Sequence, residues 1–337
     1  MTVVDAPVMD TGFPALDDDI RRELLAHCYR MLGSVHDAED LVQETYLRAW
    51  RSYDSFEGRS SLRTWLYRIA TNACLNALES RKRRPLPTGL GQPSSDPDGP
   101  LEELTEVPWL EPVPDTMVAA DVSVDPATVV TSRESIRLAF IAALQHLPPR
   151  QRAVLILRDV LRWKAAEVAE ALDTSVAAVN STLQRARAQL DKVAPTSDTV
   201  ETTLTADQRE LLERYVAAFE DYDINAIATM FTEEAIWEMP PFTGWYQGAQ
   251  VIARLIAKNC PAQRADDMRL VPTTANGQPA YGLYMRDRDG VHRAFHLQVL
   301  TIEDGKVTHV VAFFERELFA KFGLPPELPV VPAGTPA

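Results

Sequence analysis

The stretch that decides the fold is LPPRQRAVLILRDVLRWKAAEVAEALDTSVAAVNSTLQRARAQL, residues 147 to 190. Within it, KAAEVAEAL has the apolar spacing of a short helix, and VAAVNSTLQRARAQL has that of a longer one. The residues between them, DTS, are typical of a turn, and Ser175 is suited to cap the second helix. Two helices joined by so short a turn predict a helix-turn-helix, a motif that places its second helix in the major groove of DNA.

The two sides of that second helix differ in chemistry. On a helical wheel one side is apolar and is expected to pack on the preceding helices: Val176, Val179, Leu183, Ala186 and Leu190. The other side carries small residues and side chains that hydrogen-bond base edges: Ala177, Ala178, Asn180, Ser181, Gln184 and Arg185. Phosphate contacts are expected from Arg185, Arg187, Arg150, Arg152 and Lys164. The alternative is an ordinary helix bundle whose basic side faces solvent.

A second helical pattern lies near the front of the chain, in DAEDLVQETYLRAW, residues 37 to 50. Its polar side gathers Asp37, Asp40, Gln43 and Glu44 within an arc of about 120° on the wheel. Val42, Tyr46 and Ala49 fall on the opposite side and are expected in the core. Taken alone, such an acidic stripe is more simply explained as a solvated helix face.

The next stretch, SFEGRSSLRTWLYRIATNACLNALESRKRR, interleaves aromatic rings with cations. A small polar loop contains Arg59, Ser60 and Ser61, and the helix after it carries Arg63, Trp65, Arg68 and Asn72. Rings that stack on unpaired bases and cations that follow the backbone suit single-stranded or melted DNA. The alternatives are a core tryptophan at Trp65 and a solvated basic helix end at residues 81–84.

Charge is distributed unevenly around a formal net charge of −14. Residues 59–84 hold seven basic residues against one acid, and residues 85–130 hold nine acids and no Lys or Arg. Residues 131–193 hold ten basic residues against six acids, whereas residues 194–337 hold twenty acids against twelve bases. Two basic modules are therefore separated by an acidic segment and followed by an acidic domain.

The composition is that of a globular protein without targeting segments. The start, MTVVDAPVMD, has no basic patch leading into an apolar run, and no stretch approaches the roughly 20 apolar residues that span a bilayer. Cys28, Cys74 and Cys260 form no CxxC pair, so we expect reduced thiols, no zinc site and a cytoplasmic location without membrane association. No pattern for a metal or another cofactor is present.

With the motifs in this order, the chain resembles the extracytoplasmic-function sigma-70 family. HCYRMLGSVHDAEDLVQETYLRAW and SLRTWLYRIATNACLNAL are similar to region 2 of that family, and residues 147–190 are similar to region 4. The resemblance implies a promoter-specificity subunit whose partners are core RNA polymerase, through the β′ coiled coil and the β flap, and promoter DNA. It implies no catalytic residues, because RNA synthesis belongs to the polymerase.

The resemblance also implies roles for the polar residues. Asp37, Asp40, Gln43 and Glu44 become the polymerase-binding face, and residues 57–61 capture a flipped base of the −10 element. Arg63, Trp65, Arg68 and Asn72 support melting, and the helix from Val176 enters the −35 major groove, with Arg187 among its contacts. Relatives often carry a basic residue where this chain has Asn180, which puts a phosphate contact there in doubt. The acidic segment either follows the RNA path of the polymerase or is a solvated spacer.

A third module follows a short polar joint. LLERYVAAFEDYDINAIATMFTEEAIWEMPPFTGWYQGAQVIARLIAK resembles the opening of SnoaL-like domains of the NTF2 superfamily, an α+β cone. RAFHLQVLTIEDGKVTHVVAFFE alternates at period two around Asp304-Gly305 and predicts a hairpin. Candidates to line an apolar pocket, or simply to pack the core, are Trp237, Met239, Trp245, Tyr246, Tyr284, His296 and Phe314. We expect no catalysis there but regulation of the other modules in cis, with a small molecule as a possible ligand.

The prediction is a multidomain protein: two all-α modules and a C-terminal α+β cone. The expected boundaries are region 2 at 17–84, an acidic Pro-rich linker at 85–130, region 4 at 131–193 and the SnoaL-like domain at 204–325. Two alternatives remain open from the residues. One is a stand-alone helix-turn-helix regulator, and the other is a pocket enzyme fused to a DNA-binding module.

Overall fold

The structure is a computed structural model that describes residues 17–80, 83–118, 134–193 and 204–329. By contacts the chain divides into two compact units. The first holds both predicted DNA-binding modules, and the second holds the C-terminal domain together with residues 83–116 and 136–142. None of the helices in the described ranges is long and apolar enough to cross a bilayer.

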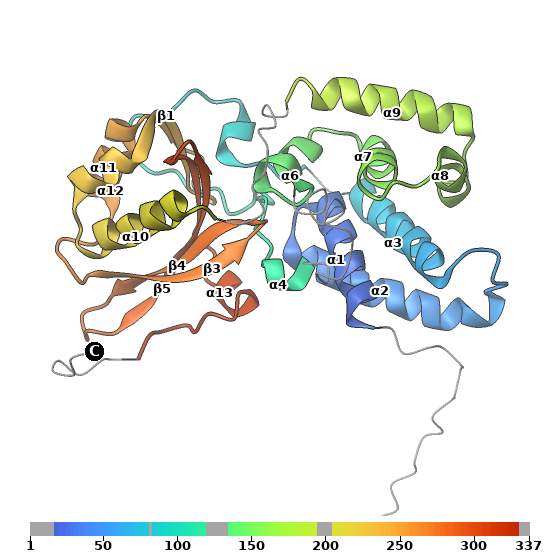
Figure 1. The fold of residues 1–337 in the computed structure, drawn as a ribbon, viewed down its shortest axis with the longest axis horizontal. Coiled ribbons are helices and arrows are strands. Elements are labelled where there is room, and N and C mark those ends of the chain that lie inside the picture. The colour runs from blue at the N-terminus through green and yellow to red at the C-terminus, as the bar shows by residue number, and fades with distance from the viewer. Residues whose placement is uncertain (1–16, 81–82, 119–133, 194–203, 330–337) are drawn as a thin grey trace, which may run out of the picture. The chain divides into compact units, whose positions relative to one another are not determined.

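The first unit is all-α, as predicted (Figure 1). Its front module packs three helices, with a short 3₁₀ turn after the second: α1 (Asp18–Leu32), α2 (Val35–Ser52), η1 (Tyr53–Ser55) and α3 (Leu62–Glu79). α1 ends at Gly33, whose φ of 70° is a left-handed conformation that glycine adopts without strain. The core includes Leu24, Cys28, Met31 and Leu66, none of them exposed to solvent.

The second module of this unit is the predicted helix-turn-helix. Its helices are α7 (Pro149–Leu155), the π-helical turn η3 (Ile156–Val160), α8 (Ala165–Ala171) and α9 (Val176–Leu190). The short helices α4 (Asp115–Val118) and α6 (Leu138–Leu144) lie at the points where the chain passes between the units. The predicted second helix, residues 176–190, coincides with α9.

The two modules pack on each other through buried arginines. Arg152 of α7 is 3% exposed, and its guanidinium donates to the carbonyl of Met31 and to Gln145 Oε1 at 2.8 Å. Nearby, Arg30 donates to the hydroxyl of Ser135 at 2.8 Å. The Arg152 bond to Met31 holds α7 against the end of α1, so Arg152 is a structural residue and not the phosphate contact that the sequence suggested.

The second unit is an α+β domain built on a six-stranded sheet of order β2-β1-β6-β5-β4-β3. Its strands are β1 (Phe231–Glu238), β2 (Trp245–Gln247), β3 (Met268–Ala275), β4 (Gln278–Arg286), β5 (His292–Glu303) and β6 (Lys306–Phe313). Its helices are α10 (Ala206–Glu220), α11 (Ile224–Met230), α12 (Ala249–Asn259) and α13 (Leu318–Lys321). The predicted hairpin is confirmed: β5 and β6 pair antiparallel around Asp304 and Gly305, both at positive φ.

The two faces of the sheet are covered differently (Figure 1). Helices α10, α11 and α12 lie over one face, here called face A, and form the main core with it. On the other face, face B, Phe319 of α13 packs edge-on against Tyr284 at 5.3 Å. Gly282 lies beneath this contact, because a Cβ there would come within 2.7 Å of Leu324 and 3.0 Å of Phe319.

Residues 83–116, the linker segment, belong to this second unit. They include the 3₁₀ turn η2 (Pro87–Leu90) and a bridge from Glu103 to Phe242. The segment is not a bare spacer, because its polar groups form hydrogen bonds with the C-terminal domain. The remainder of the predicted linker, residues 119–130, lies outside the described residues.

Candidate functional site

The acidic stripe lies on α2, whose first turn is capped by Ser34: its hydroxyl accepts from the Asp37 N–H at 3.1 Å. Asp40 and Gln43 are exposed, whereas Asp37 and Glu44 are half-buried. Glu44 accepts from Arg48 at 2.5 Å, an ion pair one helical turn apart. The four predicted residues are thus presented together on one side of a single helix.

Sequence reasoning missed two apolar residues that continue this stripe. Leu47 is 54% exposed and Trp50 is 44% exposed. They follow Gln43 at helical spacing, so the acidic patch runs into an apolar one on the same side of α2. The helical wheel contained the signal: Leu47 and Trp50 fall on the polar side of the helix, away from the buried residues Val42, Thr45 and Ala49. Exposed large apolar side chains beside charges are typical of a protein-binding surface.

The loop before α3 is small and polar, as expected. Arg59 is exposed and pairs with Glu57 at 3.1 Å, and Ser60 is half-buried. Ser61 caps α3, because its hydroxyl accepts from the Thr64 N–H at 3.1 Å. On α3, Arg68 and Asn72 are exposed, while the Arg63 guanidinium donates to Glu23 at 2.5 Å and lies over the Tyr67 ring.

The expectation for Trp65 requires correction. Its side chain is 8% exposed, and its ring packs against Phe56 at 4.9 Å and Tyr53 at 6.4 Å. A ring so enclosed cannot stack on an unpaired base in this conformation. Trp65 instead packs against the residues that precede the loop. At the basic end of this module, Arg83 donates to Gly89 O and Arg84 to Trp109 O, while residues 81 and 82 lie outside the described residues.

On α9 the predicted core side is confirmed at its centre. Val179, Leu183 and Ala186 are buried, and Ser175 caps the helix by accepting from the Ala178 N–H at 3.1 Å. Val176 was wrongly assigned to the core: it is 44% exposed, and its neighbours Ser175 and Ala177 are exposed as well.

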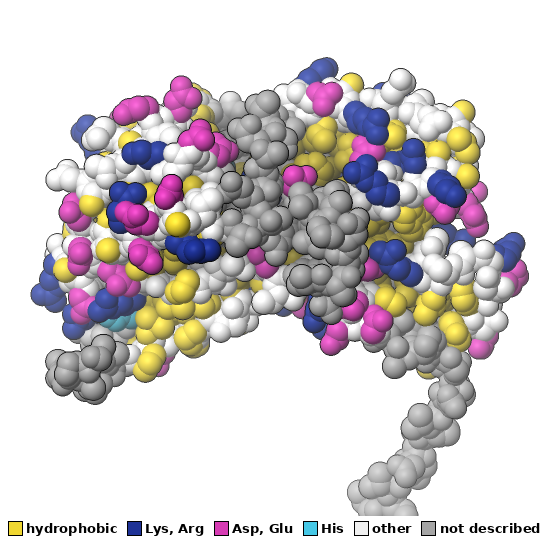
Figure 2. Space-filling view, viewed as in Figure 1, with side chains coloured by type: hydrophobic (Ala, Val, Ile, Leu, Met, Phe, Trp, Pro, Cys, Tyr) yellow, Lys and Arg dark blue, Asp and Glu magenta, His cyan; other side chains and the backbone are white. Residues whose placement is uncertain are grey.

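The opposite side of α9 is open to solvent. Its exposed residues are Ala177, Asn180, Ser181, Gln184 and Arg185, with Ala178 half-buried. Figure 2 shows Lys and Arg side chains gathered over the part of this unit that carries α7, α8 and α9. Exposed Arg150 and Lys164 belong to that part. A helix with amides and cations on a free face can hydrogen-bond base edges and phosphates.

Arg187 behaves differently from Arg185. Its guanidinium makes two bonds to the carboxylate of Asp159, at 2.9 Å and 2.7 Å, and this partner raises the Arg187 pKa above its ordinary value. The Arg185 guanidinium has only long contacts, at 3.4 Å, to Ser181 O and Thr182 Oγ1. Among the described residues Arg185 has no carboxylate partner, whereas Arg187 joins α9 to η3.

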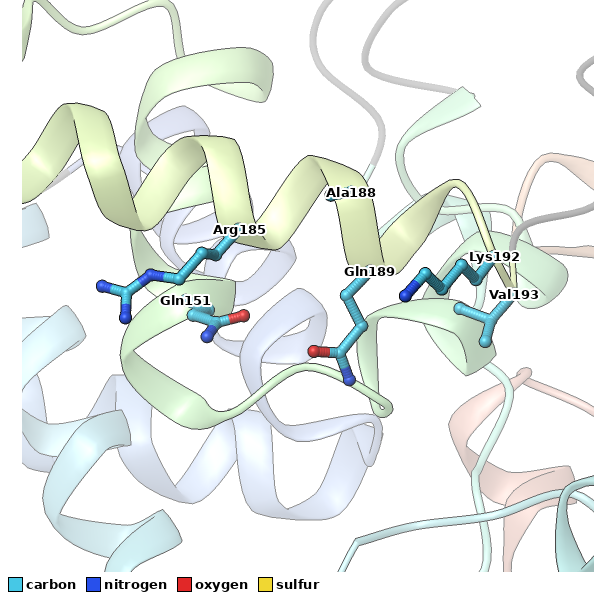
Figure 3. Close-up of a pocket in the computed structure, with 6 residues that line it drawn as sticks. All are labelled: Gln151, Arg185, Ala188, Gln189, Lys192 and Val193. Atoms are coloured by element: carbon cyan, nitrogen blue, oxygen red, sulfur yellow. The ribbon is translucent and has the colours of Figure 1, made fainter.

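A hollow of about 480 Å³ lies beside the C-terminal half of α9. It is lined by Gln151, Arg185, Ala188, Gln189, Lys192 and Val193. In Figure 3, Arg185 and Gln189 extend from α9, Lys192 comes from the turn that follows it, and Gln151 lies below Arg185. Arg185 and Lys192 are cations that lie beside the exposed Val193. The hollow therefore suits a partner segment that carries acidic and apolar residues.

In the C-terminal domain the seven pocket candidates do not share one face. Trp237 and Tyr246 are paired across β1 and β2 on face A, Met239 joins the same core, and His296 and Phe314 are in ring contact at 4.7 Å. Trp245 and Tyr284 were misassigned: Trp245 pairs with Glu238 on face B, and Tyr284 packs on α13. The period of two sends alternate residues to opposite faces.

His296 takes part in a buried chain of hydrogen bonds. Tyr215 donates its hydroxyl to Gln298 Oε1 at 2.9 Å, so the Gln298 amide nitrogen donates to His296 Nε2 at 2.8 Å. The imidazole proton is then on Nδ1, which has no hydrogen-bond partner among the described residues. Burial lowers the pKa of His296 to about 3. The arrangement is a neutral donor among aromatic rings, and no carboxylate of the described ranges bonds to it.

The linker segment is bound along the C-terminal domain at several points. The Ser95 N–H donates to Trp245 O at 2.7 Å, and the Leu104 N–H donates to Pro241 O at 3.0 Å. Further along, Val113 and Asn276 exchange two hydrogen bonds of 3.0 Å. Each such bond contributes roughly 0.5–1.5 kcal/mol net, so together they fix the path of the segment.

Comparison with family models identifies the same three regions. Residues 16–84 match the family described as Sigma-70 region 2, residues 137–190 match Sigma-70, region 4, and residues 212–310 match the SnoaL-like domain. The matches fall in the order in which the structure places the front module, the helix-turn-helix and the sheet domain.

Comparison with individual proteins covers most of the chain. The ECF RNA polymerase sigma factor SigG of Mycobacterium tuberculosis is 62% identical over 317 residues, which is 94% of this chain and 85% of that protein. The sigma factor SigJ of the same organism is 29% identical over 307 residues, or 86% and 87% of the two chains. The crystal structure of SigJ matches 91% of this chain and 98% of its own with a TM-score of 0.58 at 23% identity, which shows a shared fold.

Proposed function

The chain belongs to the ECF RNA polymerase sigma factors, and from that premise we propose which surfaces carry its function. As a sigma factor it binds core RNA polymerase and promoter DNA and directs initiation at chosen promoters. It is not an enzyme in its own right. This membership removes the stand-alone regulator and the pocket enzyme as alternatives. Because its polymerase is cytoplasmic, we propose the same location for the chain.

The polymerase dock is the exposed side of α2. We assign it Asp37, Asp40, Gln43 and Glu44, with Leu47 and Trp50 as its apolar end and the β′ coiled coil as its partner. The supporting observation is the exposure of Leu47 and Trp50 beside two exposed polar residues on an otherwise well-packed helix. A buried apolar anchor flanked by charged hydrogen bonds is how a few residues carry most of an interface's free energy.

Binding to core polymerase across a salt series tests this assignment. Asp40→Lys with Glu44→Lys is expected to abolish tight binding, and Trp50→Ala to weaken it about tenfold or more. Leu204→Ala is the control, because Leu204 is also exposed but lies in the second unit. Unchanged binding by the charge-reversed chain would exclude α2 as the dock.

DNA contacts are assigned to two surfaces of the first unit. The −35 element is read by the free side of α9 through Asn180, Ser181, Gln184 and Arg185, with Ala177 and Ala178 allowing close approach. The −10 element contacts Arg59, Ser60, Ser61, Arg63, Arg68 and Asn72. The hollow beside Arg185 and Lys192 is a candidate for the β flap. These assignments rest on exposure and on family membership together.

The C-terminal domain regulates the chain in cis by binding the linker segment. In the family this linker connects regions 2 and 4 along the RNA path of the polymerase. The support is that its acidic residues are engaged by the domain: Asp98 pairs with Arg254 and, at 3.7 Å, with Lys258. A linker bound in this way is not free to enter the polymerase, so the domain sets the fraction of chain able to act.

A small-molecule ligand of the C-terminal domain is supported by the free Nδ1–H of His296. A buried donor without a partner costs roughly 1–3 kcal/mol, which an acceptor oxygen on a flat apolar molecule would recover. Titration with a quinone or an aromatic ketone, followed by the shift of the His296 imidazole resonance, tests this. A His296→Phe chain that binds the compound equally well would contradict it.

A further inference from the structure

Glu238 is the carboxylate with the greatest burial among the described residues. It stands at the end of β1 on face B of the sheet, and its relative exposure is 0%. A carboxylate taken out of water must be paired or hydrogen-bonded, because otherwise its ionised form is strongly disfavoured. Its partners therefore show what keeps it buried.

Both partners are hydrogen-bond donors at short distance. His309 Nε2, from β6, lies 2.8 Å from Glu238 Oε1. The backbone N–H of Thr88, in η2 of the linker segment, donates to Glu238 Oε2 at 2.8 Å. Glu238 thus connects two strands of the domain to the linker, some 150 residues earlier in the chain.

The other contacts of the linker segment differ in kind. Those near Ser95 and Leu104 are backbone bonds between neutral groups, and the Asp98 pairs have side chains that are 39% to 66% exposed. At the far end of the segment the Gly277 N–H donates to Asp115 Oδ1 at 2.7 Å, but Asp115 is only half-buried and belongs to the linker itself. Exposed pairs contribute little and are screened by salt. A charge-assisted bond from a buried carboxylate is about twice as strong as a neutral one. Glu238 is therefore the fully buried carboxylate that the C-terminal domain itself supplies to the linker.

The same burial makes the hold reversible. If the linker leaves, Glu238 loses the Thr88 donor and regains water, and this hydration offsets part of the lost contact. Glu238 therefore attaches the linker through a buried carboxylate and still permits its release.

We propose that Glu238 is the positioning residue through which the C-terminal domain holds the linker segment, with His309 orienting its carboxylate toward Thr88. The inference rests on the proposed regulation in cis and names the residue that carries it. His309 is suited to this role because its side chain is 25% exposed, so its ring bonds the buried carboxylate and still reaches solvent.

Hydrogen exchange of the full-length chain tests the proposal on the peptide that contains Thr88. Glu238→Leu removes both hydrogen bonds and is expected to lower the protection of residues 85–90 at least tenfold. His309→Leu is expected to act in the same direction, while His309→Gln retains a donor and restores protection. Glu234→Gln, an exposed glutamate on the same strand, is the matched control and should leave protection unchanged.

Protection of the β5–β6 hairpin in each variant reports whether the domain remains folded. If the hairpin stays protected and residues 85–90 are as protected in Glu238→Leu as in the unaltered chain, the proposal is overturned. If Glu238→Leu unfolds the domain, the His309→Leu and His309→Gln pair decides in its place. If Glu238→Leu releases the linker but polymerase binding is unchanged, Glu238 is still the attachment residue, whereas regulation in cis is refuted. The attachment by Glu238 and the regulation in cis are therefore tested separately.

Discussion

His27 shows how a single buried residue sets the response of region 2 to pH. It is 0% exposed, and its Nε2 bonds Thr71 Oγ1 at 2.9 Å. Because Thr71 donates its own proton to Tyr67 O at 2.7 Å, His27 Nε2 is the donor and Nδ1 carries no proton. Burial first, and the charge of Arg30 second, lower the pKa of His27 to about 3.

The predicted consequence is loss of stability in acid. Below the unfolded value of about 6.5 the unfolded chain binds a proton that folded His27 does not, so each pH unit costs up to about 1.4 kcal/mol until about pH 3. Urea unfolding of region 2 at about pH 7 and about pH 5 should therefore differ by about 2 kcal/mol more in the unaltered chain than in His27→Gln. An equal pH dependence in both chains would contradict this account.

Residue roles were predictable from the sequence where a helix face is set by local spacing. Asp40, Gln43 and Gln184 are exposed as their wheel positions indicate. Trp65 and Arg152 were not predictable, because their burial depends on Phe56 and on Met31, which no periodicity links to them. Aromatic and arginine side chains fit both DNA and cores, so type alone does not distinguish the two uses.

At the scale of the elements, α9 carries two arginines, Arg185 and Arg187, that differ in their ion pairing. In the described part of the chain Arg185 contacts no carboxylate, whereas Arg187 is held by Asp159 of η3. Arg185→Ala is expected to weaken binding of the isolated chain to a −35 duplex about tenfold and to reduce its salt slope by about one. Arg187→Ala should leave specific affinity nearly unchanged and cost at most about 1 kcal/mol of stability.

Asp159→Asn is a third variant for the same comparison. Fluorescence anisotropy titrations over a salt series measure the DNA affinity of all three variants, Arg185→Ala, Arg187→Ala and Asp159→Asn. Loss of the carboxylate releases Arg187 and removes a negative charge near the phosphates, so affinity for non-specific DNA should rise. If Arg187→Ala weakened specific binding as much as Arg185→Ala, the division of labour on α9 would be wrong.

Elements whose signals are local were predicted well, and the linker segment was not. Asp304-Gly305 specifies its hairpin because the turn itself demands positive φ. The nine acids and nine prolines of residues 85–130 argue against an independent core but do not indicate the partners of the linker segment, which include Trp245, Pro241 and Asn276. A segment that folds only against residues far along the chain leaves no periodic trace in its own sequence.

At the scale of the whole molecule, regions 2 and 4 are packed together in a way that promoter binding does not allow. Tyr67 of α3 and Trp163, between η3 and α8, are in edge-on ring contact at 5.9 Å. The −10 and −35 elements are about 25 base pairs apart, or roughly 85 Å at about 3.4 Å per base pair. If regions 2 and 4 contact the −10 and −35 elements as proposed, modules joined by this ring contact and by Arg152 cannot occupy both elements at once, and the arrangement corresponds to a closed state.

We therefore predict that regions 2 and 4 separate when the chain binds core polymerase. The distance between one exposed residue in each region measures this separation. With spectroscopic labels at Asn76 of α3 and Glu170 of α8, core polymerase should lengthen the distance by tens of ångströms. Arg152→Met should populate the long distance without polymerase, because the bond to Met31 O is lost while the side-chain volume is nearly kept. Arg150→Met, on the exposed side of the same helix, should not. A distance that stays short in the polymerase complex would mean that the modules reach the promoter as one body, and the closed packing would then be part of the active state.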